Sequence, residues 1–267
     1  MPQKTFYMCP PTYFEIEYAI NVWTNINDRV DHAQAMAEWE LLNQTYQELG
    51  VHVETVPAAE GVVELTFIGD SIFLYNGKAI SSRFRCVERA NEVPVSASFF
   101  AGAGFEVCQL PEGVHYEGNG DSLIWNGIML GGHGIRSDRE AYGVIAELLN
   151  VEVIPLELVQ PFYHLDLALC PINKDTVIYY PGAFTPAAQE TIRKMAKRAV
   201  AAERDEVMKF ALNGKVIGDC IVLNGNPCPD FRHEVQNLGL RIITVNTNEF
   251  NKAGGAAKCL TLEHYLP

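Results

Sequence analysis

Apolar residues recur along the chain with a helical period in some segments and in strand-like runs in others. In residues 32–49 one helical face collects the apolar side chains, namely Ala33, Met36, Trp39, Leu42 and Tyr46. Longer helices are also predicted over residues 137–149, capped by Ser137 or Asp138, and over residues 185–202. Shorter helices are predicted at 204–211, 230–238 and 249–252.

Four aspartates each stand before an apolar run that is typical of a strand. They recur at intervals of about fifty residues, as Asp70, Asp121, Asp166 and Asp219. Two of the runs return after an Asn-Gly pair, at 76–77 and 126–127. Such a pair between apolar runs predicts a hairpin, because a type I′ turn needs positive φ at both positions. Helices and short strands, such as 105–110, 151–156 and 240–245, lie between the hairpins.

This order indicates a repeated hairpin–helix–strand unit, a period typical of propellers and arrays. Strands near Phe6 and at 259–262 complete a fifth unit from both chain ends, which closes a ring. The alternative is a chance recurrence of aspartates before apolar runs. We therefore expect one α/β domain over residues 1–267, with several of the leading aspartates near its centre. Unpaired buried carboxylates are costly in a core but suit a cage for a cation.

Composition narrows the classes of partner. Lys plus Arg is 20 against 33 Asp plus Glu, so the formal net charge is −13, and 48% of the 267 residues are apolar. This balance argues against nucleic acid as the main partner. There is no apolar run of the roughly 20 residues that span a bilayer, so no membrane partner is expected. The first residues show no secretion signal, which predicts the cytoplasm. The acidic surface indicates solubility, with a cationic ligand as the alternative.

The seven cysteines are odd in number and include no Cys-x-x-Cys pair. A disulfide framework and a zinc ribbon are therefore not expected. Most of these cysteines are interpreted as small buried apolar residues.

Four short motifs hold candidate chemistry. His164 and Asp166 are two apart on a predicted strand, so their side chains share one face. Cys259 follows the small residues 254–257, where backbone can approach a ligand closely. Glu117 lies in a glycine-rich turn, and Arg136 stands before a helix. Taken singly, each has an ordinary structural interpretation, as an ion pair, a buried thiol, a turn or a surface charge.

Taken together, these motifs resemble the pentein superfamily of guanidine-modifying enzymes, which includes arginine deiminases, dimethylarginine dimethylaminohydrolases, amidinotransferases and arginine dihydrolases. The resemblance covers essentially the whole chain. It is carried by Cys9-Pro10 with Tyr13-Phe14, by 21–23, 65–70 and 82–84 with Glu88-Arg89, and by 117–121, 162–166, 180–184 and 253–259. It implies a five-bladed α/β propeller and needs no metal or organic cofactor.

The resemblance implies a role for each matching residue. Cys259 matches the nucleophile, His164 the general acid and base, and Glu117 the acid that orients substrate and imidazole. Asp70 and Asp166 match the carboxylates that hold the guanidinium. The remaining matches are the α-carboxylate-binding arginines, Arg89 and Arg136, and a polar active-site residue of the dihydrolase branch, Asn21. The implied chemistry is attack of the thiolate on the guanidino carbon, a covalent thiouronium and its hydrolysis.

Two departures from the family pattern affect the predicted product. Asn-Pro-Trp is replaced by Asn-Val-Trp at 21–23, and Asp70 stands where dihydrolases and amidinotransferases tend to have asparagine. An ionised carboxylate offers acceptors only, so it suits a guanidinium better than neutral citrulline. We therefore expect a hydrolase of arginine or a methylated arginine that yields citrulline plus ammonia or an alkylamine.

Several alternatives stay open on the sequence. The overall resemblance also favours an arginine dihydrolase that continues to ornithine, carbon dioxide and ammonia. An amidinotransferase, a non-catalytic binding protein of the same fold and a metallohydrolase built on Cys259, His164 and Asp166 are the others, although these ligands are too few for a convincing zinc site. The oligomeric state is open, a homo-oligomer included.

Overall fold

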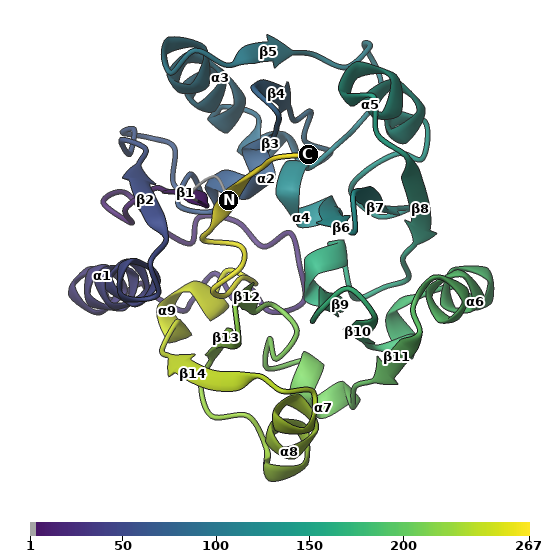
Figure 1. The fold of residues 1–267 in the computed structure, drawn as a ribbon. Helices are drawn as coiled ribbons and strands as arrows, with labels where there is room; N and C mark the ends of the chain where they lie inside the picture. Colours follow the sequence, from purple (N-terminus) through teal and green to yellow (C-terminus); the bar gives the residue numbers. More distant parts are fainter. Residues whose placement is uncertain (1–3) are drawn as a thin grey trace.

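The computed structural model describes residues 4–267 and contains five three-stranded units arranged around a common centre (Figure 1). In every unit the first strand runs antiparallel to the second, and the second runs parallel to the third. The units are β15 (Leu262–Tyr265), β1 (Thr5–Met8) and β2 (His52–Thr55); β3 (Ile72–Tyr75), β4 (Lys78–Ser81) and β5 (Glu106–Cys108); β6 (Ser122–Trp125), β7 (Ile128–His133) and β8 (Val153–Glu157); β9 (Leu169–Pro171), β10 (Thr176–Tyr179) and β11 (Arg198–Ala201); and β12 (Lys215–Ile217), β13 (Cys220–Asn224) and β14 (Arg241–Val245).

One longer helix connects the second and third strands of each unit and lies on the outside of the arrangement (Figure 1). These helices are α1 (His32–Glu48), α3 (Glu92–Gly102), α5 (Ala141–Leu149), α6 (Pro186–Met195) and α8 (Pro229–Asn237). Shorter turns of helix are α2 (Ile68–Ser71), α4 (Gly118–Asp121), α7 (Arg204–Val207), α9 (Asn248–Asn251), η1 (Val87–Arg89), η2 (Leu165–Leu167) and η3 (Pro181–Ala183).

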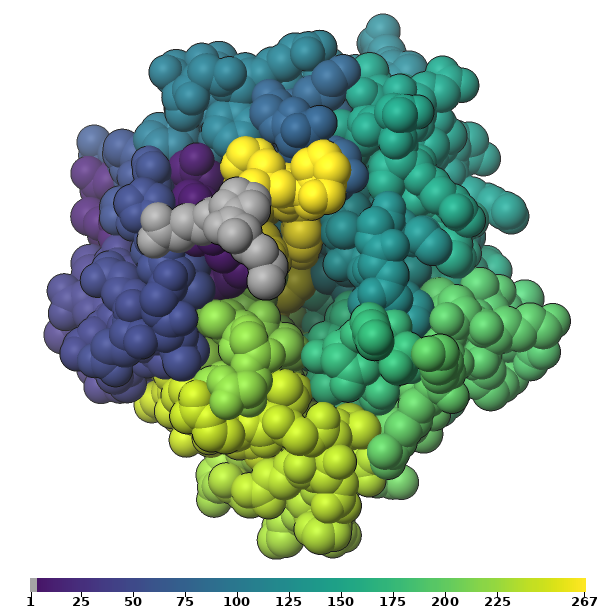
Figure 2. All heavy atoms as spheres, viewed as in Figure 1, coloured from purple at the N-terminus to yellow at the C-terminus, as the bar shows by residue number. Residues whose placement is uncertain are grey.

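The two chain ends build one unit together, as the sequence predicts. Phe6 of β1 pairs with Glu263 of β15, and β15 also runs parallel to β3, which joins the first two units into a six-stranded sheet. Figure 2 shows the face on which the ends lie, with a hollow beside the C-terminal segment. Within residues 4–267 no helix is long and apolar enough to cross a bilayer.

The predicted hairpin turns are confirmed at the two Asn-Gly pairs. Asn76 and Gly77 have φ of 48° and 77°, and Asn126 and Gly127 have φ of 54° and 79°. Both residues of each pair therefore adopt the left-handed conformation that a type I′ turn requires.

The helix predictions need corrections at their ends. The predicted helix over 185–202 ends at Met195, because residues 198–201 pair with β10 as a parallel strand. The helix predicted from residue 137 begins only at Ala141, and the one over 204–211 stops at Val207. The sequence reading missed α3, in which apolar residues lie on several faces instead of one.

The fourth leading aspartate was also assigned to the wrong position. Asp219 lies in the turn between β12 and β13, where its side chain is 69% exposed and pairs with Arg241. The position that corresponds to Asp70 is occupied by Asn213, two residues before β12. The error arises because β12 has only three residues, so the apolar run after Asp219 was taken for the first strand of the unit, whereas it is the second, β13.

Candidate active site

The start of each unit places a polar residue near the common centre. Asp70 is the third residue of α2, before β3, and Asp121 ends α4, before β6. Asp166 lies in the 3-10 turn η2, before β9, and not on the strand that the sequence predicts for His164 and Asp166. Cys259 stands three residues before β15. Because the units share one topology, residues far apart in the sequence come together.

All eight predicted site residues meet around one narrow cavity. Five of them line it, namely Asn21, Asp70, Arg89, Arg136 and Cys259. The other three are buried and contact these residues directly, namely Glu117, His164 and Asp166. The cavity volume is about 10 Å³, room for roughly one water molecule.

His164 is held by a carboxylate that is itself held by an arginine. The His164 Nε2 atom lies 2.8 Å from Glu117 Oε2, and Arg136 Nη1 donates to the same oxygen at 2.8 Å. Burial would raise the pKa of Glu117, but the hydrogen bond from His164 and the charge of Arg136 lower it to about 2. Burial would lower the pKa of His164, but Asp70, Asp121 and Glu117 raise it to about 9. The imidazole is therefore protonated at neutral pH and can act as an acid.

The second nitrogen of this imidazole faces Asp70. With Nε2 bound to Glu117, Nδ1 lies 3.8 Å from Asp70 Oδ1. Nδ1 is therefore the nitrogen that points toward the cavity side of the imidazole.

Arg89 is surrounded by three carboxylates. Its guanidinium contacts Asp70 at 2.8 Å, Glu92 at 2.6 and 2.9 Å, and Glu64 at 3.1 Å. Burial raises the pKa of Glu64 to about 7 and that of Glu92 to about 8, although Arg89 opposes both shifts. Arg89 therefore fixes Asp70 in place as well as lining the cavity.

One oxygen of Asp70 has no hydrogen-bond donor among the described residues. Asp70 Oδ2 accepts from Arg89, whereas Oδ1 is buried and finds no hydrogen-bond donor anywhere in residues 4–267. A buried acceptor without a donor costs about 1–3 kcal/mol, so it is a feature that a ligand can satisfy.

Cys259 is a buried thiol with an acidic neighbour. Its Sγ atom lies 3.7 and 4.0 Å from the two oxygens of Asp166 and 3.1 Å from Asn213 Nδ2. Burial, with the charges of Asp166 and Asp70, raises the pKa of the Cys259 thiol well above its usual range. A cation placed between these carboxylates would reverse that effect and favour the thiolate.

Asn21 holds the covering loop, the segment around Ile20 and Asn21 that lines the cavity, in place by hydrogen bonds. Its Nδ2 donates to Ala253 O at 2.9 Å, and its Oδ1 accepts from Trp23 N at 2.9 Å. Arg136 Nη2 donates to Ile20 O at 3.0 Å, which ties the same loop to the His164 side of the cavity.

Gly120 is the glycine that the site geometry requires. A Cβ atom there would lie 2.6 Å from His164 Nδ1 and 2.8 Å from Asp70 Oδ1. The turn before β6 can therefore approach both side chains closely only without a side chain of its own.

Sequence analysis missed several residues that the structure brings to the site. Glu64, Glu92 and Asn213 lie outside the short motifs and become neighbours only in space. A signal was available for Asn213 alone, because the repeat places it where the other units carry an aspartate.

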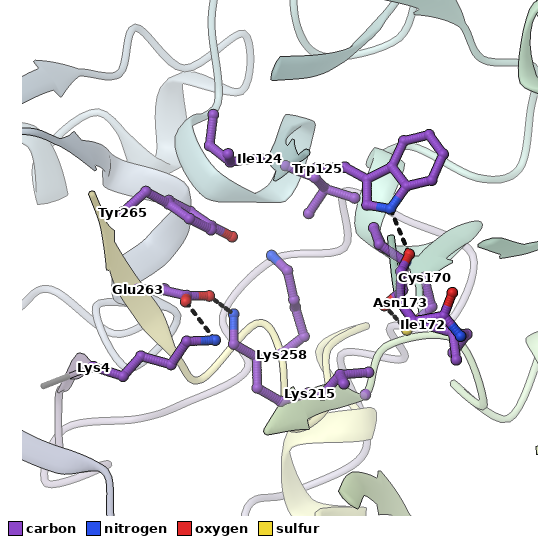
Figure 3. A pocket seen from close by; sticks show the side chains of 14 residues that line it. Lys4, Ile124, Trp125, Cys170, Ile172, Asn173, Lys215, Lys258, Glu263 and Tyr265 are labelled. Atoms are coloured by element: carbon purple, nitrogen blue, oxygen red, sulfur yellow. Dashed lines mark hydrogen bonds and ion pairs between the residues drawn. The ribbon is translucent and has the colours of Figure 1, made fainter. Parts of the chain in front are cut away.

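Another cavity, of about 280 Å³, is lined in part by Lys258, the residue before Cys259 (Figure 3). Lys4 and Lys215 point toward Glu263 from two sides, and Lys258 lies beside them. Lys258 also lies 3.4 Å from Asp166, so the residue before Cys259 balances the acid beside the sulfur. This cavity contains none of the predicted site residues.

Within residues 4–267, no group of three or more His, Cys, Asp or Glu side chains is placed to hold a metal ion. The seven cysteines in this part of the chain are free thiols.

Comparison with known proteins decides the family. No protein-family model matches the chain. It is 35% identical over 263 residues to an N(G),N(G)-dimethylarginine dimethylaminohydrolase of Mycobacterium tuberculosis, covering 97% of this chain and 85% of that protein. The chain belongs to the guanidine-modifying hydrolases of the pentein superfamily.

Arginine dihydrolases of this family are similar as well. The bifunctional arginine dihydrolase/ornithine cyclodeaminase AgrE of Nostoc is 33% identical over 96% of this chain, which spans 37% of that protein. The N-terminal domain of ArgZ, a cyanobacterial arginine dihydrolase, superposes with a TM-score of 0.94 at 30% identity over 99% of both chains. That domain has been solved with substrate bound to a cysteine-to-serine variant and, in an asparagine-to-serine variant, covalently bound to a reaction intermediate.

Proposed function

We propose that this protein hydrolyses the guanidino group of arginine or of an N-methylated arginine and releases citrulline with ammonia or an alkylamine. The observation that carries the proposal is Asp70 Oδ1, a buried carboxylate oxygen without a donor that lines the same cavity as Cys259. A guanidinium N–H supplies the missing donor and brings the guanidino carbon toward the sulfur.

The charges around the cavity favour a cationic ligand. Glu64, Asp70 and Glu92 share one guanidinium, that of Arg89, while Asp166 stands on the other side of Cys259. Three carboxylates for one cation leave this side of the cavity short of positive charge. The guanidinium of the substrate supplies it.

Asp70 and Asp166 hold this guanidinium from two sides of the nucleophile, and Asn21 keeps the covering loop closed over it. The α-carboxylate of the substrate binds to Arg136 and Arg89. Arg136 leads in this role, because among the described residues one carboxylate, Glu117, pairs with it, whereas three already surround Arg89.

Chemistry then begins with Cys259. Binding of the cation favours the thiolate, and the thiol proton passes to solvent. The sulfur attacks the guanidino carbon, and the C–N bond to the departing amine breaks as protonated His164 gives its proton to that nitrogen. A positively charged thiouronium remains on Cys259, and the imidazole is neutral.

Hydrolysis completes the cycle. Neutral His164 removes a proton from a water molecule, whose oxygen bonds to the thiouronium carbon. The C–S bond then breaks as the hydroxyl on the carbon loses its proton, so that the ureido product leaves with the new oxygen and the Cys259 thiol is regenerated with a proton from the hydroxyl or from solvent. Glu117 stabilises the imidazolium at the start and end of each cycle, since it accepts from Nε2 in both.

We also propose that the five units form a closed five-bladed α/β propeller. The repeated strand order and the pairing of β1 with β15 support this description.

An arginine dihydrolase is the second candidate, supported by the TM-score of 0.94 to the ArgZ domain. Such an enzyme must accept citrulline as its second substrate. Asp70 offers acceptors to citrulline but no donor to its ureido oxygen, which favours a reaction that stops after one hydrolysis.

Product analysis by mass spectrometry tests the proposal. The purified protein is incubated separately with arginine, Nω,Nω-dimethylarginine and citrulline, with Cys259→Ser as the control. Citrulline from either guanidine, absent in the control, is the expected result. Ornithine from arginine or citrulline would contradict the single hydrolysis, and no product from any compound would contradict the function.

A further inference from the structure

Asn213 holds the backbone on both sides of the nucleophile. Its Oδ1 accepts from the N–H of Ala256 at 3.1 Å and from the N–H of Cys259 at 3.2 Å, and its carbonyl accepts from Lys258 N at 3.1 Å. The side chain is fully buried, so these contacts are fixed by the fold.

These contacts decide which way the amide points. Backbone N–H groups can only donate, so the oxygen of the side chain must face Ala256 and Cys259. The NH₂ group must then face the other way, where it lies 3.1 Å from Cys259 Sγ and 3.3 Å from Asp166 O. The sulfur thus has a neutral hydrogen-bond donor in fixed orientation.

The repeat explains why an amide is needed here. Three other units carry a carboxylate at the corresponding position, namely Asp70, Asp121 and Asp166. Two of them already raise the pKa of Cys259, and Lys258 works against that effect. A carboxylate at position 213 would add a further negative charge at hydrogen-bond distance from the sulfur.

We propose that Asn213 is a positioning residue that stabilises the Cys259 thiolate through Nδ2 while Oδ1 fixes the turn that presents the sulfur. This inference rests on the proposed function, in which Cys259 is the nucleophile. The groups that act on the sulfur are Asp166, Asp70, Lys258, the backbone N–H of Ala256 and the Asn213 amide, and the amide is the uncharged side-chain donor among them.

The decisive variant is Asn213→Asp. It keeps the shape and the acceptor for both backbone N–H groups, but it replaces the donor to sulfur with a charge. We expect alkylation of Cys259 by iodoacetamide at pH 8, quantified on its peptide by mass spectrometry, to slow at least about tenfold. As the pH falls and the introduced carboxyl gains a proton, it can donate again, so the ratio to wild type should recover toward one.

Asn226→Asp is the matched control, because it adds the same charge at an exposed asparagine. Asn213→Ser, which removes the amide donor without adding charge, should slow alkylation severalfold if the aspartate variant fails to fold. Wild-type rates and pH dependence in a folded Asn213 variant would overturn the proposal. Alkylation needs no substrate, so this result is independent of whether Cys259→Ser loses turnover, which tests the nucleophile itself.

Discussion

Asp70→Asn separates the effect of the Asp70 carboxylate on substrate binding from its effect on the Cys259 thiol. The substitution keeps the side-chain shape but removes the negative charge and one acceptor. Asp70 Oδ2 is 2.8 Å from Arg89, and Oδ1 is the oxygen that awaits a donor. Arg89 retains Glu64 and Glu92 after the change, so the fold should survive.

The structure sets the size of the effect on binding. One charge-assisted hydrogen bond to the substrate guanidinium contributes about 1.5–3 kcal/mol. Its loss corresponds to roughly a 10- to 150-fold rise in KM for arginine, since about 1.4 kcal/mol is tenfold. Citrulline should lose less, because an asparagine amide can donate to the ureido oxygen.

The effect on the free thiol has the opposite sign. The charge of Asp70 contributes to the raised pKa of Cys259, so its removal lowers that pKa. Alkylation of Cys259 by iodoacetamide in the absence of substrate should therefore become faster while arginine binding becomes weaker. A general loosening of the fold would not weaken the binding of cationic arginine more than inhibition by neutral citrulline.

Steady-state kinetics with arginine, without and with citrulline as a product inhibitor, measure the effect on binding, and alkylation rates at pH 8 measure the effect on the thiol. Asp219→Asn is the matched control, since this exposed aspartate precedes a similar apolar run but lies in a hairpin turn. It should leave both assays unchanged. An unaltered KM for arginine in Asp70→Asn would refute the assignment of Asp70 to the guanidinium.

Three further changes test the remaining groups. Cys259→Ser should reduce turnover by about 10⁴-fold or more with an unchanged circular dichroism spectrum, and retained activity would rule out this nucleophile. Gly120→Ala should lower kcat at least about a hundredfold, because its Cβ atom displaces His164 and Asp70; near-normal kcat would show that the close approach is unimportant. Glu117→Gln removes the negative charge that helps raise the pKa of His164 to about 9, so activity should be lost at lower pH than in the wild type as the pH rises; an unchanged alkaline limb in the pH profile of kcat would contradict His164 as the acid.

The fold was predictable where a local signal fixes the backbone. Asn76-Gly77 and Asn126-Gly127 specify their turns through the left-handed conformation of both residues. The end of α6 was not predictable in this way, because residues 198–201 form a strand only through parallel pairing with β10. Asp219 was misplaced for a related reason, since a three-residue strand carries too few positions to show a period.

The site was predictable where residues lie together in short motifs. Cys259, His164 and Glu117 each belong to a segment that is unusual by itself, and the structure places them around one cavity. Glu64 and Glu92 carry no such signal, because each is recognisable only as a neighbour of Arg89. Single residues that reach the site from a different element need the tertiary structure to be found.

The alternation of charge explains how the centre tolerates so many buried acids. Glu92, Arg89 and Asp70 form one series of opposite charges. His164, Glu117 and Arg136 form a second, and both series end at the cavity. Each guanidinium also lies over an aromatic ring, at 4.7 Å from Phe84 for Arg89 and from Tyr163 for Arg136.

Within residues 4–267, Asp70 Oδ1 has no hydrogen-bond donor, although His164 Nδ1 lies 3.8 Å from it. Burial and neighbouring carboxylates raise the pKa of Glu64 to about 7 and of Glu92 to about 8 against the effect of Arg89, which indicates a shortage of positive charge around these carboxylates. A substrate guanidinium that binds Asp70 extends the alternation by one cation and relieves this shortage. The same cation lies beside Cys259, so the interaction that completes the charge pattern is also the one that activates the nucleophile.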